Sequence, residues 1–540
     1  MGIHASGVLV MPCEVTNYFP TRTEDGIRIT LFTGPQIEEL NGIKLDLLGL
    51  KTLDVLDKCL KSINKDYTVD DLYKKIETCL DNKKMFNMIN EKETEGIFQM
   101  ESPLFKSLVE TIIPTDINDI CAILACGRPG PLGAGMHTAY GNRKNGFEES
   151  IPQLRNTEDI TGDTYNTIIY QEQCMLISKK VAKFDDSQSD SLCRKPLAKK
   201  KKKLMEIFRK CFIFGKKNCE PPKDYDETDE NQPYYDPKGK YGKEILGGIN
   251  NGYTYEELAE FYEKLKGYCS YLFNKSHSAS YSVITLCTMY LKANYYTKFF
   301  AALLSMQTKE EKIDMYIKLL KANNIKIKCP NINISTYDFT EDNGDILYGL
   351  NAIKGVGVTS IPTLIENRPY KNIEDAIERV PKKALNKKVL SSLIMSGAFD
   401  FEDNNRYKLL NLMYDLRKDK DERYDENNYN KISCMNFEKD RLGTSVTYQS
   451  EWDKIQDKEQ TTLTFNLIDT EVRKDKRGKD MAFLKLEVEG VEINALAFSS
   501  LYAKNISAFD TNITKSLTLL GKKDNNKFII NKIINRNLIA

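Results

Sequence analysis

Lys44 and Asp46 lie two positions apart in the apolar segment 42–53. Apolar residues alternate with them, so we expect a β-strand that carries both charged side chains on one face. A carboxylate held on a rigid strand beside a cation suits a Mg²⁺ site that also contacts phosphates. The alternative is a surface ion pair on an amphipathic strand, and the spacing alone favours that alternative.

Two other segments combine a cation with a backbone suited to anions. Two prolines and three glycines follow Arg128 within seven residues, which predicts a rigid loop. A ligand could approach closely at Gly130, and Arg128 could hold a phosphate or stack on a base. Residues 273–281 open a predicted long helix, whose N terminus favours anions beside Lys275 and His277. The alternatives are an ordinary turn and a capped helix with a packed histidine.

Two basic turns are predicted to contact DNA. A glycine, a hydrophobic residue and a second glycine end an apolar segment at 349–357. This pattern is typical of a helix-hairpin-helix, whose turn amides bind a phosphate without reading sequence. An ordinary helical hairpin is the alternative. The second turn lies between two predicted strands at 473–479. The residues expected to contact DNA are Lys354, Gly355, Gly357, Arg473, Lys476 and Arg477.

The elements that must position these residues change character along the chain. Strands are predicted near 7–10 and 43–48, and mostly helical periodicity continues to about residue 330. Compact helices are expected to residue 400, followed by a charged, Asn- and Tyr-rich segment. From about residue 461 the period becomes two, which predicts five short strands closed into a small barrel of the OB type. The fold class is therefore α+β with several domains.

Composition excludes several classes of protein. The 540 residues suggest three or four domains, and a hydrophobic fraction of 41% indicates a globular chain. The net charge of +1 confines any nucleic-acid surface to local patches. Thirteen scattered cysteines and three histidines argue against a zinc site and indicate a reducing compartment. We see no signal peptide or long apolar run, so we expect a cytoplasmic protein without membrane contact.

Several motifs together resemble the C-family DNA polymerase III α subunit, in its C-terminal part. They resemble that family in order and spacing over most of residues 1–400. The resemblance implies the C-terminal part of a palm at 1–50, fingers at 51–330, a helix-hairpin-helix region at 331–400, a charged linker or helical region at 401–460 and an OB-fold at 461–540. The motif segments, beside those above, are 2–7, 96–102, 170–173, 273–278 and 394–400.

The resemblance implies nucleotidyl transfer of dNTPs to a primer 3′ end by two Mg²⁺ ions. Asp46 would be one of three catalytic carboxylates and a metal ligand, and Lys44 would neutralise charge on the triphosphate. Residues expected at the nucleotide are Arg128, Gly130, Arg194, Lys275 and His277. The implied partners are primer-template DNA and dNTPs, and a sliding clamp is a further candidate.

The sequence departs from this family because two of the three catalytic carboxylates of the palm have no counterpart in it. The other two palm aspartates would precede this chain, and Asp224 and Asp226 lie in a polar segment that we interpret as a solvated loop. One carboxylate cannot hold two Mg²⁺ ions, so we expect an isolated chain to be inactive. A second polypeptide with the N-terminal palm and phosphoesterase-like half should complete the enzyme. The alternatives are a non-catalytic DNA-binding remnant or scaffold of a replication complex, and a chain whose true start lies further upstream. Abundant Lys, Asn and Ile suggests an AT-rich genome, such as that of a phage.

Overall fold

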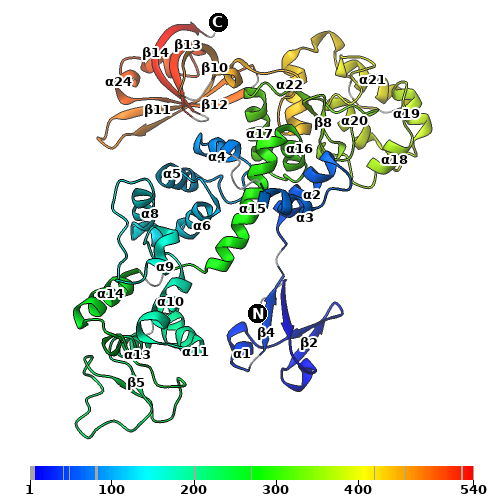
Figure 1. Ribbon diagram of the computed structural model, residues 1–540. Coiled ribbons are helices and arrows are strands. Elements are labelled where there is room, and N and C mark those ends of the chain that lie inside the picture. The colour runs from blue at the N-terminus through cyan, green and yellow to red at the C-terminus, as the bar shows by residue number, and fades with distance from the viewer. Residues whose placement is uncertain are drawn as a thin grey trace.

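The computed structural model describes residues 6–538 apart from 41, 48, 79–82, 200–201, 269–270, 419, 422, 456–457, 490 and 525–526. We distinguish four parts of the chain (Figure 1). They are the N-terminal unit (6–47), the helical unit (49–322), the hairpin unit (324–446) and the barrel unit (449–538). One apolar core runs through the helical and hairpin units, and a second fills the barrel unit.

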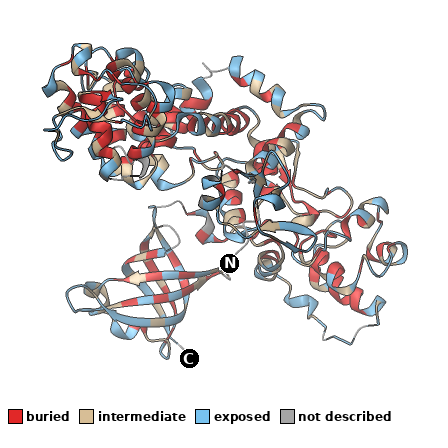
Figure 2. Cartoon of the chain, turned by 90° about the horizontal axis from the view of Figure 1, so that it is seen from below, coloured by how far each residue is buried: buried red, intermediate tan, exposed pale blue. Residues whose placement is uncertain are grey.

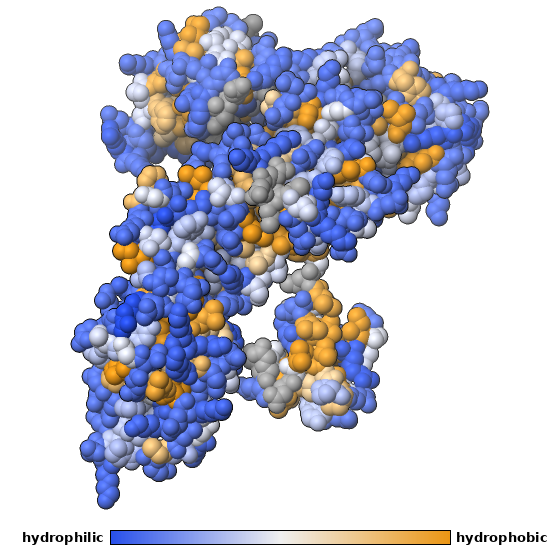
Figure 3. Space-filling model, viewed as in Figure 1, coloured by the Kyte–Doolittle hydropathy of each residue, from blue (hydrophilic) through white to orange (hydrophobic). Residues whose placement is uncertain are grey.

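The N-terminal unit is small and lies apart from the rest of the chain (Figure 1). β1 pairs with β4 in an antiparallel sheet, with Gly7 opposite Asp46 and Val10 opposite Ile43, and β2 and β3 form a separate hairpin. Apolar residues gather on its surface (Figure 3), because few of its side chains are buried. Its elements are β1 (Gly7–Val10), β2 (Thr21–Glu24), β3 (Ile27–Thr30), α1 (Gly34–Glu39) and β4 (Ile43–Asp46).

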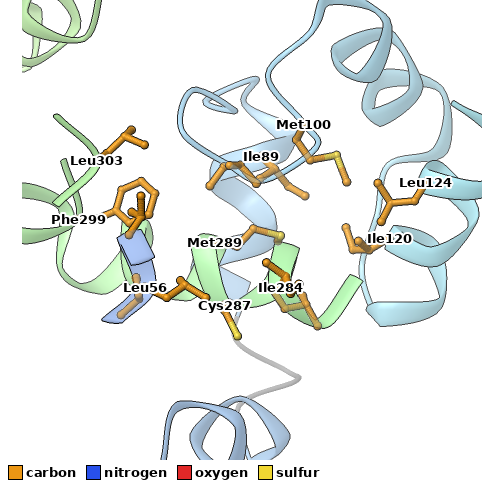
Figure 4. Packing of buried hydrophobic residues seen from close by; sticks show 14 of the residues in the cluster. Leu56, Ile89, Met100, Ile120, Leu124, Ile284, Cys287, Met289, Phe299 and Leu303 are labelled. Atoms are coloured by element: carbon orange, nitrogen blue, oxygen red, sulfur yellow. The ribbon is translucent and has the colours of Figure 1, made fainter. Parts of the chain in front are cut away.

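The helical unit is built around one long buried helix, α15 (Lys275–Asn294). Every residue from 284 to 293 is buried, so this part of the helix is covered on all sides. In Figure 4, Ile284, Cys287 and Met289 of α15 lie among apolar side chains from segments before and after it in sequence. None of the described helices combines the length and the hydropathy that a membrane span requires.

The other helices of this unit are shorter, and those within 51–90, 117–126 and 296–305 pack against α15. The principal ones are α2 (Lys51–Ile63), α3 (Val69–Thr78), α4 (Lys83–Asn90), α5 (Pro103–Ile112), α6 (Ile117–Cys126), α7 (Pro129–Gly133), α8 (Met136–Lys144), α10 (Gln171–Ala182), the π-helix η3 (Ser189–Arg194), α13 (Lys202–Ile213), α14 (Tyr255–Tyr268), α16 (Tyr296–Ser305) and α17 (Glu310–Ala322).

The segment between α13 and α14 folds back on α13, and buried cations hold it there. Lys216 donates to Gly242 O at 2.9 Å and lies 3.3 Å from Asp236 Oδ2. Lys210 Nζ donates to Glu227 O at 2.8 Å. The side chains of Asp224 and Asp226 stay exposed on the outer part of this segment, which confirms that they lie in a solvated loop.

The hairpin unit contains a three-stranded sheet that the sequence analysis did not predict. The strands are two or three residues long, too short for a period of two to be recognised. The element before the glycine turn is the 3-10 helix η6 (Leu350–Ala352), not the helix expected of a helix-hairpin-helix. Gly349 before it and Ile353 after it both have extended backbones, which leaves only three residues for a helical turn. The other elements are β7 (Ile327–Lys328), β8 (Thr340–Asp342), β9 (Asp345–Leu347), α18 (Ile361–Glu366), α19 (Ile373–Arg379), α20 (Lys387–Met395), α21 (Arg406–Leu416) and α22 (Lys431–Leu442).

The barrel unit is a closed five-stranded barrel in the order β10-β11-β12-β14-β13. Residues such as Phe465 and Leu486 alternate with exposed neighbours and fill the interior, which is buried in Figure 2. Alternation therefore predicted both the strands and their inner faces. The strands are β10 (Gln460–Lys474), β11 (Asp480–Val488), β12 (Val491–Ala497), β13 (Thr514–Asp524) and β14 (Lys527–Leu538).

Candidate functional site

Lys44 and Asp46 occupy the same face of β4, as the strand alternation predicts. Lys44 Nζ lies 3.0 Å from Asp46 Oδ1, and the two side chains are 30% and 45% exposed. An ion pair this accessible contributes at most about 1 kcal/mol to stability. The pair with Lys44 therefore adds little to folding, and the Asp46 carboxylate is nearly half exposed to solvent.

The described part of the chain does not form a complete metal site. No group of three or more His, Cys, Asp or Glu side chains in it is placed to hold a metal ion. Asp46 is the single carboxylate that β4 presents, since its other residues are Ile43, Lys44 and Leu45. A pair of Mg²⁺ ions needs more carboxylates than this strand supplies. Residues 2–5 of the motif at 2–7 lie outside the described residues.

Four of the predicted motif segments meet at α15 and at the segment that leads into it. The segment 271–273 runs into the helix beside residues 169–171: Gln171 N donates to Phe273 O and Phe273 N donates to Ile169 O, both at 2.9 Å. Residues 96–102 lie further along α15, where Phe98 N donates to Thr288 Oγ1 at 3.1 Å. The tertiary structure thus brings together pieces that are up to about 180 residues apart in sequence.

Arg128 is held at the end of α6 and against the segment before α15. Its guanidinium donates to Ala125 O at 3.1–3.2 Å and to Tyr271 O at 2.7 Å. It also lies over the Phe273 ring, 4.3 Å from the centroid. Burial lowers the pKa of Arg128. Since two of its three nitrogens already bind carbonyls, Arg128 orients the entrance to α15 and keeps only part of its donor capacity for a ligand.

The segment after Arg128 is not the predicted rigid loop but the short helix α7, which proline can begin. Gly130 allows the Tyr271 ring to lie directly on the backbone of this helix. A Cβ atom at position 130 would lie 2.1 Å from Tyr271 Cδ1, whereas one at Gly133 would meet nothing within 4 Å. The close approach that the sequence predicted at Gly130 is therefore made by a side chain of the chain itself. Tyr271 was missed in the sequence analysis because no pattern links it to residue 130.

Lys275 and His277 project from the first turn of α15. Asn274 caps the helix by accepting from His277 N at 2.9 Å, and Glu172 Oε2 accepts from Lys275 N at 3.0 Å. The His277 ring packs against Tyr281, with centroids 4.4 Å apart. The structure thus contains both features of the alternative that the sequence raised, a capped helix and a packed histidine. Glu172 belongs to the predicted motif segment 170–173, but no sequence pattern indicates that it caps α15.

Arg194 lies on the π-helix η3, and no contact joins it to Arg128 or to the first turn of α15 in the described structure. Its Nε donates to Asp190 Oδ1 at 2.5 Å, and Lys195 Nζ lies 2.8 Å from Asp190 Oδ2. Burial raises the pKa of Asp190, but the hydrogen bonds from Lys195 and Arg194 outweigh burial and lower it. π-Helical turns are frequent at functional sites.

The two predicted DNA-binding turns are both exposed. Lys354 N donates to Arg441 O at 2.9 Å, and Gly355 has a φ of +100°, which favours glycine. In the barrel unit, Arg473 forms a two-point pair with Glu471 at 2.7 Å. The side chains of Lys476 and Arg477 lie at the tip of the β10–β11 hairpin and have no partner among the described residues.

Comparisons with known proteins agree with this arrangement. Residues 52–219 match the family described as bacterial DNA polymerase III alpha subunit finger domain, and residues 324–409 match the helix-hairpin-helix motif. DNA polymerase III subunit alpha of Aquifex aeolicus (strain VF5) is 30% identical over 537 residues, which covers 93% of this chain and 42% of that protein.

Two further relatives give the same result. The protein of the same name from Escherichia coli (strain K12) is 32% identical over 440 residues, covering 78% of this chain and 35% of the relative. The one from Bacillus subtilis (strain 168) is 32% identical over 412 residues, covering 75% and 34%. The chain therefore spans only about a third to two fifths of the length of these relatives.

These matches place the chain among the bacterial DNA polymerase subunits. They match a finger domain and a helix-hairpin-helix motif within it. Within that class it is a relative of the DNA polymerase III alpha subunit. The resemblance seen in the sequence is confirmed.

Proposed function

We propose that this chain is a subunit of a DNA-directed DNA polymerase and adds dNTPs to a primer 3′ end when a second polypeptide supplies the first half of the palm. The observation that carries the proposal is the contact of the motif segments with α15 and with the segment that leads into it, in a chain related to DNA polymerase III alpha subunits. In this proposal residues 1–50 complete the palm and residues 51–330 form the fingers.

The nucleotide would bind near the first turn of α15. Lys275 and His277 would contact the triphosphate or the base, and Arg128 and Gly130 would shape the pocket through Phe273 and Tyr271. Arg194 would reach the phosphates only if it leaves Asp190.

The exposed apolar surface of the N-terminal unit supports a second polypeptide. Ile43, Leu45 and Leu47 of the β4 segment are all exposed, and so are Val8 and Val10 of β1. A two-stranded sheet is at best marginally stable by itself, and contiguous exposed apolar residues mark interaction surfaces. Further strands that carry the remaining carboxylates would bury these residues and bring Asp46 into a shared site.

Mg²⁺ is the cofactor that we propose, with Asp46 as the one ligand from this chain. Bound Mg²⁺ would activate the primer hydroxyl and stabilise the leaving pyrophosphate. Because the described residues do not hold two ions by themselves, the other ligands would come from the second polypeptide.

Two surfaces would hold the primer-template DNA. One is the turn of Lys354, Gly355 and Gly357. The other is the barrel, which we propose to be an OB-fold because its strands follow the order first, second, third, fifth, fourth, with the third and fifth parallel. The loop between the first two strands of an OB-fold commonly binds oligonucleotides, and here that loop carries Lys476 and Arg477. We further propose a sliding clamp as a partner of this chain and the cytoplasm as its location.

The proposal is tested by reconstitution. The full chain would be co-expressed with a polypeptide that contains the phosphoesterase-like domain and first palm half, and primer extension would be measured with Mg²⁺ and dNTPs. We expect stable co-purification and extension that neither chain supports alone. DNA binding without extension by the complex would instead favour a non-catalytic scaffold, and failure to bind DNA would contradict both functions.

Gly130→Ala should impair use of the nucleotide in that complex. The new methyl group must displace the Tyr271 ring, and with it the segment that leads into Lys275 and His277. A misplacement of about 1 Å at a reactive site can cost roughly a hundredfold, so we expect a rise in KM for dNTPs of at least about tenfold. Gly133→Ala is the matched control, because its methyl group meets no neighbour within 4 Å. Equal KM values for the two variants would contradict the assignment.

A further inference from the structure

The glycine turn of the hairpin unit presents a row of free backbone donors. Among the described residues, the amides of Gly355, Gly357 and Val358 have no hydrogen-bond acceptor. Gly357 and Val358 are exposed. Gly357 and Val358 therefore supply two successive free amides, and successive amides of a turn can form a concavity that binds anions.

Arg441, at the end of α22, is docked on this turn from outside the helix-hairpin-helix match. Its carbonyl accepts the Lys354 amide at 2.9 Å. Its Nη1 atom lies 3.7 Å from the position that a Cβ atom of Gly355 would occupy. A side chain at position 355 would also come within 2.4 Å of Ser392 Oγ, so glycine is needed for α20 to pack this closely on the turn.

The Arg441 side chain has unused donor capacity. Its Nε atom is buried and has no hydrogen-bond partner, while Nη2 lies 3.2 Å from Asp440 Oδ2. A buried donor without an acceptor costs about 1–3 kcal/mol. The Nη1 atom lies beside the turn and has no acceptor among the described residues, and an arginine beside free amides matches the geometry of a phosphate.

We propose that Arg441 completes a site for one phosphodiester of the DNA backbone, together with Lys354 and the amides of the glycine turn. The inference rests on the proposed function and adds a residue of α22 to the DNA contact. Two carboxylates compete with the phosphate: Asp440 beside Arg441, and Glu310 at 3.8 Å from Lys354 Nζ. The pair of Lys354 and Glu310 is well exposed, so it is readily exchanged for a phosphate.

The test is binding of fluorescein-labelled primer-template DNA by the full chain, followed by anisotropy at several salt concentrations. Arg441→Gln should weaken binding about tenfold, the effect of losing one hydrogen bond to a charged group. It should also lower the slope of log Kd against log salt by about 1, equally for unrelated DNA sequences. Arg441→Lys should keep the slope but bind less tightly, because lysine lacks the two-point geometry.

Arg423→Gln is the matched control, since it removes the same charge from an exposed arginine paired with Asp415 in the same unit. It should leave affinity and slope unchanged. Unaltered binding by Arg441→Gln, or an equal loss in Arg423→Gln, would overturn the inference and leave the proposed function intact. Absence of DNA binding by the unaltered chain would overturn the proposed function itself. Thermal melting of each variant confirms folding, and Arg441→Lys still provides the test if Arg441→Gln does not fold.

Discussion

Asp46→Asn in the reconstituted complex should reduce primer extension by at least about a thousandfold. A metal ion at the reacting phosphate contributes several kcal/mol of charge stabilisation, and each 1.36 kcal/mol corresponds to roughly a factor of ten in rate. Asparagine keeps the size of the side chain but removes the charge that binds Mg²⁺. Because the pair of Asp46 with Lys44 is exposed and such pairs add little to stability, the variant should fold and bind DNA as the unaltered chain does.

The matched control for this prediction is Asp25→Asn. Asp25 lies in the turn between β2 and β3 of the same small unit and is exposed, with a φ of 47° that asparagine also tolerates. It should retain full activity. Lys44→Met should have a smaller effect, seen mainly as a higher KM for dNTPs. Extension at the normal rate by Asp46→Asn would remove this residue from the catalytic site and the N-terminal unit from the proposed palm.

Arg406→Met should destabilise the hairpin unit by about 3–5 kcal/mol, because it leaves the buried carboxylate of Glu438 and the half-buried one of Asp400 without their cation. Arg406 is 1% exposed, and its guanidinium lies 2.7 Å from Asp400 Oδ2 and 3.0 Å from Glu438 Oε1. It also donates to Met395 O at 3.0 Å. The hairpin unit shares one apolar core with the helical unit, so the two should melt together, and the calorimetric midpoint of that transition should fall by roughly 5 °C.

Arg423→Met serves as the control for Arg406→Met, because Arg423 is an exposed arginine of the same unit. Its transition should stay within about 2 °C of the unaltered chain. A similar loss in both variants would show that removal of any positive charge, and not the buried network, lowers stability.

Glu438 makes the stability of the same network dependent on pH. Burial by itself raises the pKa of Glu438, but Arg406 and hydrogen bonds from Thr447 and Val446 outweigh burial and lower it. A carboxyl group whose pKa is lowered by folding stabilises the protein above its unfolded pKa of about 4.3. That contribution is lost as the pH falls through the folded value. The difference in melting temperature between the unaltered chain and Glu438→Gln should therefore narrow below about pH 4.

The sequence by itself determined the local elements and the kinds of residue that they carry. Alternation predicted the barrel strands because an inner face must exclude water at every second residue, and Leu463 and Phe465 are buried as expected. The same rule placed Lys44 and Asp46 on one face. It failed for the short strands of the hairpin unit and for η6, where two or three residues are too few to show a period.

Only the tertiary structure decided which residues meet. Arg128 binds the carbonyl of Tyr271, 143 residues later, and Glu172 caps a helix 103 residues away. Arg406 likewise pairs with carboxylates from other segments, Asp400 and Glu438. The hydrogen bond from the Lys354 amide to the Arg441 carbonyl also joins separate segments. These contacts follow from how helices pack around α15 and around the glycine turn, and packing depends on the shapes of many side chains at once. Periodicity records which face of a segment is apolar, but it carries no information about which other segment will cover that face.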